Sequence, residues 1–255
     1  MTRGLTLTPL TGIKLVEPGD DLAQIALEAF AANEVTPQDN DVLVLAQKIV
    51  SKAEGRYAEL GDQTPSAAAI SLAAETDKDA RLIEIILGES KRVVRRRPGL
   101  LIMEHKLGFV MANAGVDHSN ITHPGADERV LLLPCDPDRS ASALHERLRA
   151  ATGKHIAVVI NDSFGRPWRK GVCGIALGAA GLPAVIDKRG APDLFGRILL
   201  VTEIGFADEI AAAASLVMGQ ANEAVPMVLV RGLCWDAPEA PVAAMVRPVE
   251  HDLFR

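Results

Sequence analysis

His155-Ile-Ala-Val-Val-Ile-Asn-Asp-Ser-Phe-Gly-Arg-Pro-Trp-Arg-Lys-Gly171 is an apolar run that ends in a carboxylate, a hydroxyl and several cationic side chains. Its β-branched and aliphatic residues predict a strand that is buried on both faces, as in the interior of an α/β sheet. Open α/β sheets bind their ligands just beyond the carboxyl ends of such strands. We therefore expect Asp162 and Ser163 to stand at a ligand site.

The residues after this strand suit a metal-bound polyphosphate. A hard divalent cation prefers oxygen ligands, which Asp162 and Ser163 offer. A polyphosphate also attracts fixed positive charge, and Arg166, Arg169 and Lys170 follow directly. The alternative is structural, because Asp and Ser after a strand also form ordinary helix N-caps and turns. This segment alone leaves both interpretations open.

A second segment, Leu107-Gly-Phe-Val-Met-Ala-Asn-Ala-Gly-Val-Asp-His-Ser-Asn120, repeats the arrangement. An apolar strand is followed by Asp117 and, three residues later, by Asn120. Two aspartates at strand ends can share one metal cluster. His118 is either a functional residue or a loop histidine facing solvent. The side chains around it offer mainly oxygen donors, so an oxygen-rich site for magnesium or manganese fits better than a zinc site.

The composition is that of an ordinary globular protein. The chain has 255 residues, 48% hydrophobic and 24% charged, enough for one large domain or two intimately joined subdomains. A net charge of -6 argues against a general binder of nucleic acids or anionic membranes. The three cysteines form no Cys-x-x-Cys pair, so neither a disulfide framework nor a zinc site is supported. Without a signal-like start or a membrane-length apolar stretch, a cytoplasmic protein is expected.

Periodicity and capping residues predict an α/β succession of elements. A dinucleotide-binding glycine fingerprint and a phosphate-binding P-loop motif are both missing from the sequence. The expected elements are a strand around Leu5 to Leu15, a helix from Leu22 to near Asn33, a buried strand within Asp41 to Lys52, helices over Asp79 to Leu87, Asp138 to Ala151 and Ala207 to Met218, and a strand over Met227 to Arg231.

Three local features have a functional and a structural interpretation. Lys48, Lys52 and Arg56 share one face if their segment is helical, either aimed at a common anion or forming a solvated basic face. The basic stretch Lys91 to Arg97 either receives an acidic or phosphorylated substrate, or pairs with acidic groups of the protein or of a partner subunit. The polar loop after Gly219 either touches a ligand or only caps a helix.

Several ordered motifs together resemble the coenzyme F420-0:L-glutamate ligase family over nearly the whole chain. They are Val44 to Gly55, Ala114 to Asn120, Ile160 to Arg169, Val201-Thr-Glu and Ala207-Asp-Glu. The resemblance implies an unusual mixed α/β fold, a single catalytic domain over residues 1–255 without a fused nitroreductase-like domain, and an intertwined homodimer. It also implies a GTP-dependent ligase that adds L-glutamate to the lactyl-phosphate tail of a deazaflavin, with Mg²⁺ or Mn²⁺, two ions per site, and with K⁺ helpful in some members.

The resemblance also implies roles for individual residues. Asp117, Asp162 and Ser163 match metal ligands, and Gln220 is a further candidate. Ser163 replaces a threonine found in some relatives, Gln47 often has a serine counterpart, and Gln220 lies in a variable loop. The expected nucleotide contacts are Ile13, Lys14, Leu15 and Val16 near the N-terminus, Gln47 and Lys52 after the second strand, Asn120, and the loop residues Gly219, Gln220 and Ala221.

The chemistry of amide synthesis gives these residues a common purpose. A carboxylate is a poor acyl donor, so GTP would first convert it to an acyl phosphate, which the amine of glutamate then attacks. Metals held by Asp117 and Asp162 would draw the reacting groups together, and Lys52, with Arg166 or Arg169, would offset the developing charge. The alternatives are a metal-dependent phosphotransferase or phosphatase, and a non-catalytic GTP-binding protein of the same pathway.

Overall fold

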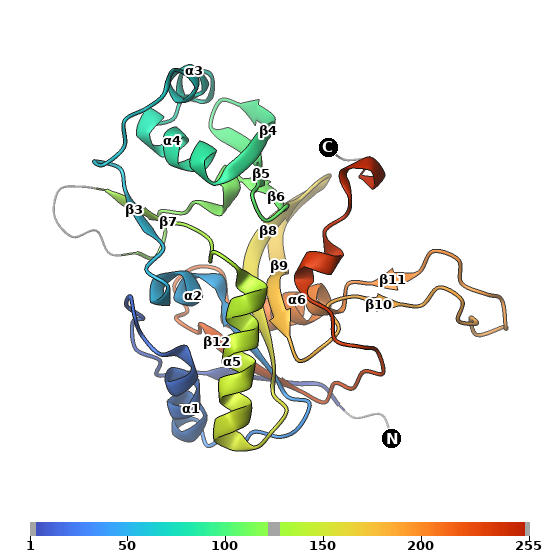
Figure 1. Ribbon diagram of the computed structural model, residues 1–255. Helices are drawn as coiled ribbons and strands as arrows, with labels where there is room; N and C mark the ends of the chain where they lie inside the picture. The colour runs from blue at the N-terminus through green and yellow to red at the C-terminus, as the bar shows by residue number, and fades with distance from the viewer. Residues whose placement is uncertain (1–3, 122–127, 253–255) are drawn as a thin grey trace.

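The protein is a mixed α/β structure built on a five-stranded sheet (Figure 1). The computed structural model describes residues 4–121 and 128–252. The strands of the main sheet are, in spatial order, β1 (Thr6–Leu10), β12 (Met227–Arg231), β2 (Val42–Ala46), β8 (Ala157–Arg166) and β9 (Arg169–Ala180). Strands β2 and β8 are parallel, while the other neighbours are antiparallel.

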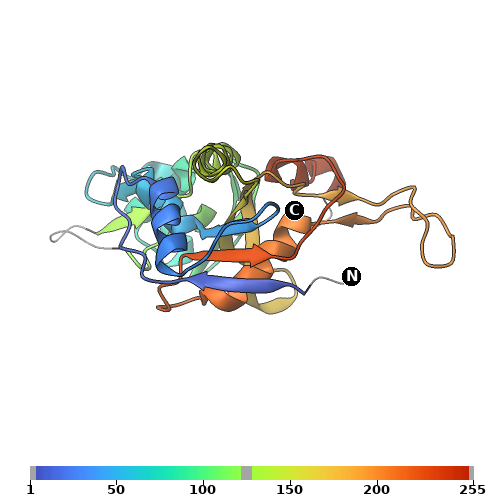
Figure 2. The same ribbon diagram turned by 90° about the horizontal axis from the view of Figure 1, so that it is seen from below.

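Both faces of this sheet are covered, as the apolar runs predict. Leu43 and Leu45 of β2 pack on the side of α1 (Leu22–Ala32) and α5 (Pro137–Thr152), whereas Val42 and Val44 pack against α6 (Phe206–Met218). Figure 2 shows α5 and α6 on opposite sides of the sheet. The prediction of strands buried on both faces is thus confirmed, since the alternating side chains of one strand supply two separate cores.

A second group of elements lies at one end of the sheet, at the top of Figure 1. Its own apolar cluster includes Ile83, Leu101 and Met103, all fully buried. The elements are β3 (Tyr57–Glu59) paired with β7 (Arg129–Leu131), the helices α3 (Ala67–Thr76) and α4 (Ala80–Gly88), the sheet of β4 (Ser90–Arg97), β5 (Leu100–His105) and β6 (Val110–Ala112), and the 3-10 turn η1 (Asn113–Gly115).

A long arm projects from the body in both views (Figures 1 and 2). It begins with β10 (Ile186–Asp187) and returns through β11 (Glu203–Ile204). Apolar side chains on the arm are exposed, with Phe195 at 91%. The chain then forms α6 and β12 and ends in the short 3-10 turns η2 (Val242–Met245) and η3 (Val249–His251). No helix within the described ranges is long and apolar enough to cross a membrane.

The helix predictions are confirmed, with boundaries set by their capping residues. Asp21 accepts hydrogen bonds from the backbone at the start of α1, and Asn33 caps its end. Asp79 caps α4 in the same way. Helix α6 stops at Gly219, whose φ of 74° is a backbone conformation that glycine adopts without strain.

Two strand predictions are wrong in their extent. The first strand ends at Leu10 instead of reaching Leu15, because the chain turns at Gly12 with φ at 75°. The strand expected to end before Asp162 continues to Arg166, because β9 pairs with it throughout, with Asp162 opposite Ile175.

Asp117 does not directly follow a strand either. Strand β6 ends at Ala112, and η1 separates it from Asp117. The backbone of Asp117 instead forms a single antiparallel bridge with Leu131, with N–O distances of 3.0 and 2.9 Å. Asp117 is therefore positioned by its pairing with the last residue of β7 and not by a strand that ends just before it.

Candidate functional site

The site begins where the parallel pair of strands comes apart. Ala46, the last residue of β2, is opposite Asn161 of β8. The chain after β2 turns at once into α2 (Gln47–Ala53), while β8 continues in the hairpin with β9. Asp162 is thus the first residue of β8 beyond its parallel neighbour. The strand end that matters for the site is that of β2.

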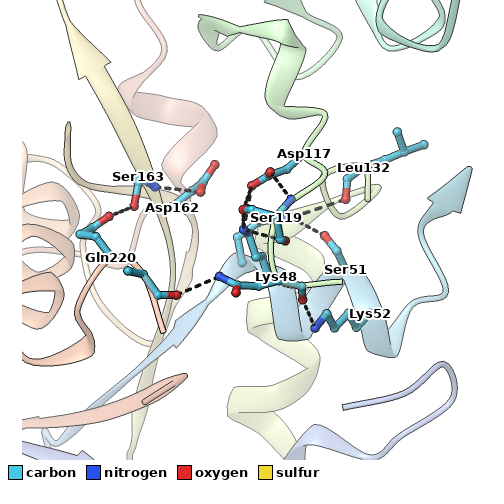
Figure 3. Close-up of polar contacts among 12 residues, drawn as sticks. Lys48, Ser51, Lys52, Asp117, Ser119, Leu132, Asp162, Ser163 and Gln220 are labelled. Carbon is cyan, nitrogen blue, oxygen red and sulfur yellow. Dashed lines mark hydrogen bonds and ion pairs between the residues drawn. The ribbon is translucent and has the colours of Figure 1, made fainter. Parts of the chain in front are cut away.

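Two lysines of α2 hold the loop that carries Asp117. The ammonium of Lys48 lies 2.7 Å from Asp117 Oδ2 and also donates to the carbonyl oxygen of Ser119 at 3.1 Å. One turn later, Lys52 Nζ donates to the carbonyl oxygen of Asn120 at 2.7 Å. Figure 3 shows both lysines reaching from α2 toward this loop. Of the three cations expected on one helix face, Lys48 and Lys52 lie on α2 and point into the site, whereas α2 ends at Ala53, before Arg56.

A fourth segment closes the site from the side of α6. The side-chain amide of Asn120 donates to the carbonyl oxygen of Ala221 at 3.0 Å. The hydroxyl of Ser163 donates to Gln220 Oε1 in a close contact. Helix α2, the loop from Asp117 to Asn120, β8 and the loop after Gly219 are thus joined by polar contacts (Figure 3). Segments far apart in the sequence converge at one place.

The two carboxylates differ in their electrostatic setting. Burial and the nearby charge of Asp117 raise the pKa of Asp162 to about 6, although the backbone N–H of Ser163 and the charge of Lys48 oppose the shift. Burial also acts on Asp117, but hydrogen bonds from Lys48 and Ser119 outweigh it and hold its pKa below the usual value. Asp117 is stabilised as an anion by its present contacts, whereas an additional cation would stabilise the ionised form of Asp162.

The raised pKa of Asp162 predicts a pH-dependent cost to stability. A carboxyl whose folded pKa lies above its unfolded value of 3.8 binds more protons when folded, so its contribution to stability falls as pH rises from about 4 to about 6. Asp162→Asn has no such titration. We expect this variant to become more stable than the wild type above pH 6, by on the order of 2 kcal/mol.

Denaturant unfolding of both proteins from pH 4 to 7, without added divalent metal, measures this difference, since the other carboxyls are shared. A stability difference that stays constant over this range would contradict the shift.

The donor atoms fit a hard divalent cation. Asp117, Asp162, Ser163 and Gln220 offer only oxygens, and the two carboxylates are near enough for the charge of one to raise the pKa of the other. Among the residues that the structure describes, no three His, Cys, Asp or Glu side chains gather in a metal-binding group. A metal here would therefore need the hydroxyl and amide oxygens, water or a substrate as further ligands.

The remaining expected nucleotide contacts are Gln47, the first residue of α2, and the N-terminal segment from Ile13 to Val16. Gln47 is buried and donates from Nε2 to Ser51 Oγ at 2.6 Å, inside the helix that carries the lysines. The N-terminal segment is tied to the end of α2, because Gly19 N donates to Ala53 O at 2.8 Å. Within it, Val16 is buried and Ile13 packs on the core, whereas Leu15 is exposed and Lys14 pairs with Asp20.

Arg166 and Arg169 are not brought to the carboxylates. In the strand register they lie opposite each other at the closed end of the β8–β9 hairpin. Four residues of extended strand place Arg166 roughly 13 Å beyond Asp162. Arg166 Nη1 is buried and has no hydrogen-bond partner within residues 4–121 and 128–252, and Arg169 is exposed. Their expected role on the transferred phosphoryl group would therefore require another molecule or a movement of the hairpin.

Other cations serve the structure. Arg56, the third cation of the expected basic face, turns away to Glu89 at 2.7 Å and to the carbonyl oxygen of Leu133. In the basic strand β4, Arg92 pairs with Glu104 at 2.8 Å, and Arg96 pairs with Glu75. The structural interpretation holds for these arginines. His118 is half-buried, so it is not a fully exposed loop residue.

Sequence reasoning overlooked Ser119 and the partner of Lys48. Ser119 donates from its backbone N–H to Asp117 Oδ1 at 2.7 Å and from its hydroxyl to Oδ2 at 3.0 Å. The sequence signal was present, since Asp followed two residues later by Ser commonly forms such a turn. Lys48 was recognised as a cation, but its contact with Asp117 spans 69 residues and leaves no local signal.

Comparison with known proteins places these features in one family. The sequence profile described as F420-0:Gamma-glutamyl ligase matches residues 12–232. A Coenzyme F420:L-glutamate ligase of Methanothermobacter thermautotrophicus is 44% identical over 254 residues, covering 99% of each chain. Proteins with the same name from Methanopyrus kandleri, 44% identical with 98% of each chain covered, and from Archaeoglobus fulgidus, 41% identical with 97% of this chain and 95% of the relative covered, are also similar.

Proposed function

This chain belongs to the F420-0:gamma-glutamyl ligase family, and we propose that it uses GTP and divalent metal to join L-glutamate to the lactyl-phosphate tail of coenzyme F420-0. It is thus an enzyme of coenzyme F420 biosynthesis. The convergence of Asp117 and Asp162 beside the lysines of α2 is the observation that supports the GTP- and metal-dependent reaction.

The proposed reaction has two steps. The tail carboxylate first attacks the γ-phosphorus of GTP, so that a carboxyl O–P bond forms while the bond to the β-phosphate oxygen breaks. The amine of glutamate then attacks the acyl phosphate, an amide bond forms, inorganic phosphate leaves, and the amine loses a proton. Nothing is oxidised or reduced.

Named residues support these steps. Under this proposal Asp117, Asp162, Ser163 and Gln220 hold Mg²⁺ or Mn²⁺, with K⁺ as a further candidate activator, and the divalent cation supplies charge that neutralises the phosphates. Lys52 and Asn120 are hydrogen-bonded to each other, which places a cation beside a proposed nucleotide contact. Fixed cations in a partly buried site stabilise the developing phosphoryl charge without reorganisation.

Mass spectrometry of the deazaflavin product tests the function directly. The purified protein is incubated with coenzyme F420-0, L-glutamate, GTP and Mg²⁺ or Mn²⁺. A mass gain of whole glutamyl units that requires GTP is expected, and it also counts the additions. GTP hydrolysis without a mass gain would instead support the phosphatase alternative, and GTP binding without turnover would support a binding protein.

The arm supports the proposed homodimer. Leu194, Phe195, Leu200 and Val201 are at least three-quarters exposed. Apolar side chains gathered on one projecting segment are typical of a surface that another protein covers. We infer that a second copy of the chain covers them, since relatives of this family are expected to be homodimers.

Charges on the arm should therefore separate the two subunits. The double change Leu194→Asp and Phe195→Asp is expected to convert a dimer into a monomer, because burying unpaired carboxylates in an apolar interface is costly. Size-exclusion chromatography with light scattering measures the mass of both proteins. Leu216→Asp on α6, where the leucine is 86% exposed, is the matched control. A monomeric wild type, or a dimer that survives the double change, would exclude this interface.

A further inference from the structure

The ammonium of Lys48 has three polar contacts, one with Asp117 and two with Ser119. Lys48 Nζ contacts Asp117 Oδ2 at 2.7 Å, Ser119 O at 3.1 Å and Ser119 Oγ at 2.5 Å. An ammonium group carries three N–H bonds, so this geometry uses all of them. Lys48 thus neutralises the carboxylate and also holds the loop on which that carboxylate stands.

The carboxylate of Asp117 in turn has three polar contacts. Its Oδ1 accepts from the backbone N–H of Ser119, and its Oδ2 accepts from the hydroxyl of Ser119 and from Lys48. The Ser119 contacts are local and fixed by the turn. Lys48, by contrast, stands on a four-carbon stem that can rotate while α2 stays in place. It is the partner of Asp117 that can leave.

The neighbouring lysine differs in this respect. Lys52 lies one turn farther along α2 and donates to a neutral carbonyl oxygen, that of Asn120. Burial, and then the charges of Lys48 and Arg129, lower its pKa, so the two ammonium groups are close enough to repel each other. The two lysines share charge, helix and face, but only Lys48 occupies a carboxylate oxygen.

We propose that Lys48 and a divalent cation compete for Asp117 Oδ2. When a polyphosphate binds, the ammonium of Lys48 moves to its oxygens and leaves Asp117 to the metal. An ammonium group and a divalent cation on the same carboxylate oxygen repel each other, so each weakens the binding of the other. A bound polyphosphate would offer the displaced ammonium new anionic oxygens. The inference rests on the proposed function only in that the ligand is a metal-bound nucleotide.

This exchange makes metal and nucleotide binding mutually reinforcing. Metal bound at Asp117 frees Lys48 for the phosphate, and phosphate that binds Lys48 frees Asp117 for the metal. By thermodynamic linkage, each ligand strengthens the other by the same factor. The same exchange removes one of the two contacts that hold this loop on α2, while Lys52 still holds it at Asn120.

Binding of Mn²⁺, followed by electron paramagnetic resonance without nucleotide, deazaflavin or glutamate, tests the competition. Lys48→Met removes the competing cation, and we expect it to bind Mn²⁺ about tenfold more tightly than the wild type. Lys48→Gln should show the same gain, which guards against a folding defect in one variant. Lys48→Arg keeps a cation at this position and should stay close to the wild type.

Lys52→Met is the matched control, since it removes an equal charge from the same helix face without freeing a carboxylate. If Lys52→Met tightens Mn²⁺ binding as much as Lys48→Met does, the effect is only long-range charge and the exchange is excluded. Unchanged Mn²⁺ affinity in both neutral Lys48 variants would exclude it as well.

The coupling is measured by GTP affinity in EDTA and at saturating Mn²⁺. The ratio of these two affinities should be severalfold smaller in Lys48→Met than in the wild type, and an equal ratio would overturn the proposal. Both binding assays are independent of amide formation. A protein that fails as a ligase can still show the exchange, and an active ligase can lack it.

Discussion

Asp162→Asn is expected to lower kcat/KM for glutamate addition by about a thousandfold, because it removes a charge from the proposed metal site. The substitution keeps the side-chain volume. The amide can still accept the hydrogen bond that Ser163 N donates to Asp162 Oδ1 at 2.8 Å. The fold should therefore survive while the partner of Asp117 in metal binding is lost. Product formation by mass spectrometry and unfolding by circular dichroism measure the two effects.

Asp208→Asn provides the matched control. Asp208 is a partly buried aspartate whose pKa is also raised, mainly by burial, and it likewise accepts a backbone hydrogen bond, from Ala176 at 2.9 Å. It lies in the first turn of α6, and the site proposed above does not include it. We expect near wild-type turnover for this variant. Near wild-type turnover in Asp162→Asn itself would contradict the assignment of Asp162 as a metal ligand.

The largest expected loss of stability comes from a glycine of β9. A Cβ added at Gly178 would overlap the backbone C and O atoms of Pro137 and approach Asp138 N at 2.7 Å. These are main-chain atoms in the first turn of α5, so they cannot rotate aside as a flexible side chain would. Gly178→Ala should reduce the free energy of unfolding by about 3 kcal/mol, the scale of overpacking a rigid contact.

Gly165→Ala tests whether the clash is the cause. Gly165 lies on the partner strand β8, no atom of the described residues comes within 4 Å of its added Cβ, and its φ is not positive. This change should stay within about 0.5 kcal/mol of the wild type. Denaturant midpoints at equal m-values compare the variants. An equal loss in both would mean that strand glycines in general, rather than the contact with α5, set the cost.

Local signals predicted much of the main sheet. The apolar runs at Val42–Ala46 and Met227–Arg231 form central strands, because a short apolar run rich in valine and bounded by turn residues is typical of a buried strand. Asp21 and Asp79 began helices because their carboxylates satisfy free backbone N–H groups. These features depend on neighbours within a few residues, which the sequence displays.

The predictions were wrong where residues far away in the sequence determine the structure. Asn161, Asp162 and Ser163 look like the polar end of a strand, yet β8 continues because β9 supplies hydrogen bonds to its backbone. Arg56 fits the spacing of the α2 lysines, but α2 ends at Ala53, and Arg56 pairs instead with Glu89, 33 positions away. The expected site residues around α2 do converge, whereas the arginines of the hairpin do not. The residue types indicated which chemistry the site could perform, whereas only the topology of the fold showed which of these residues lie together.

The direct passage from β2 into α2 determines which side of the site can open. Ala46 is still in register with Asn161, and Gln47 is already helical, so no flexible residue separates the sheet from the two lysines. Displacing their backbone would require local unfolding of a central strand, which belongs to the most stable part of a protein. The loop at Ser119 and the loop after Gly219 carry no such constraint. The α2 side of the site is thus fixed, whereas the two loops can move. Ligands should therefore enter and leave past these loops.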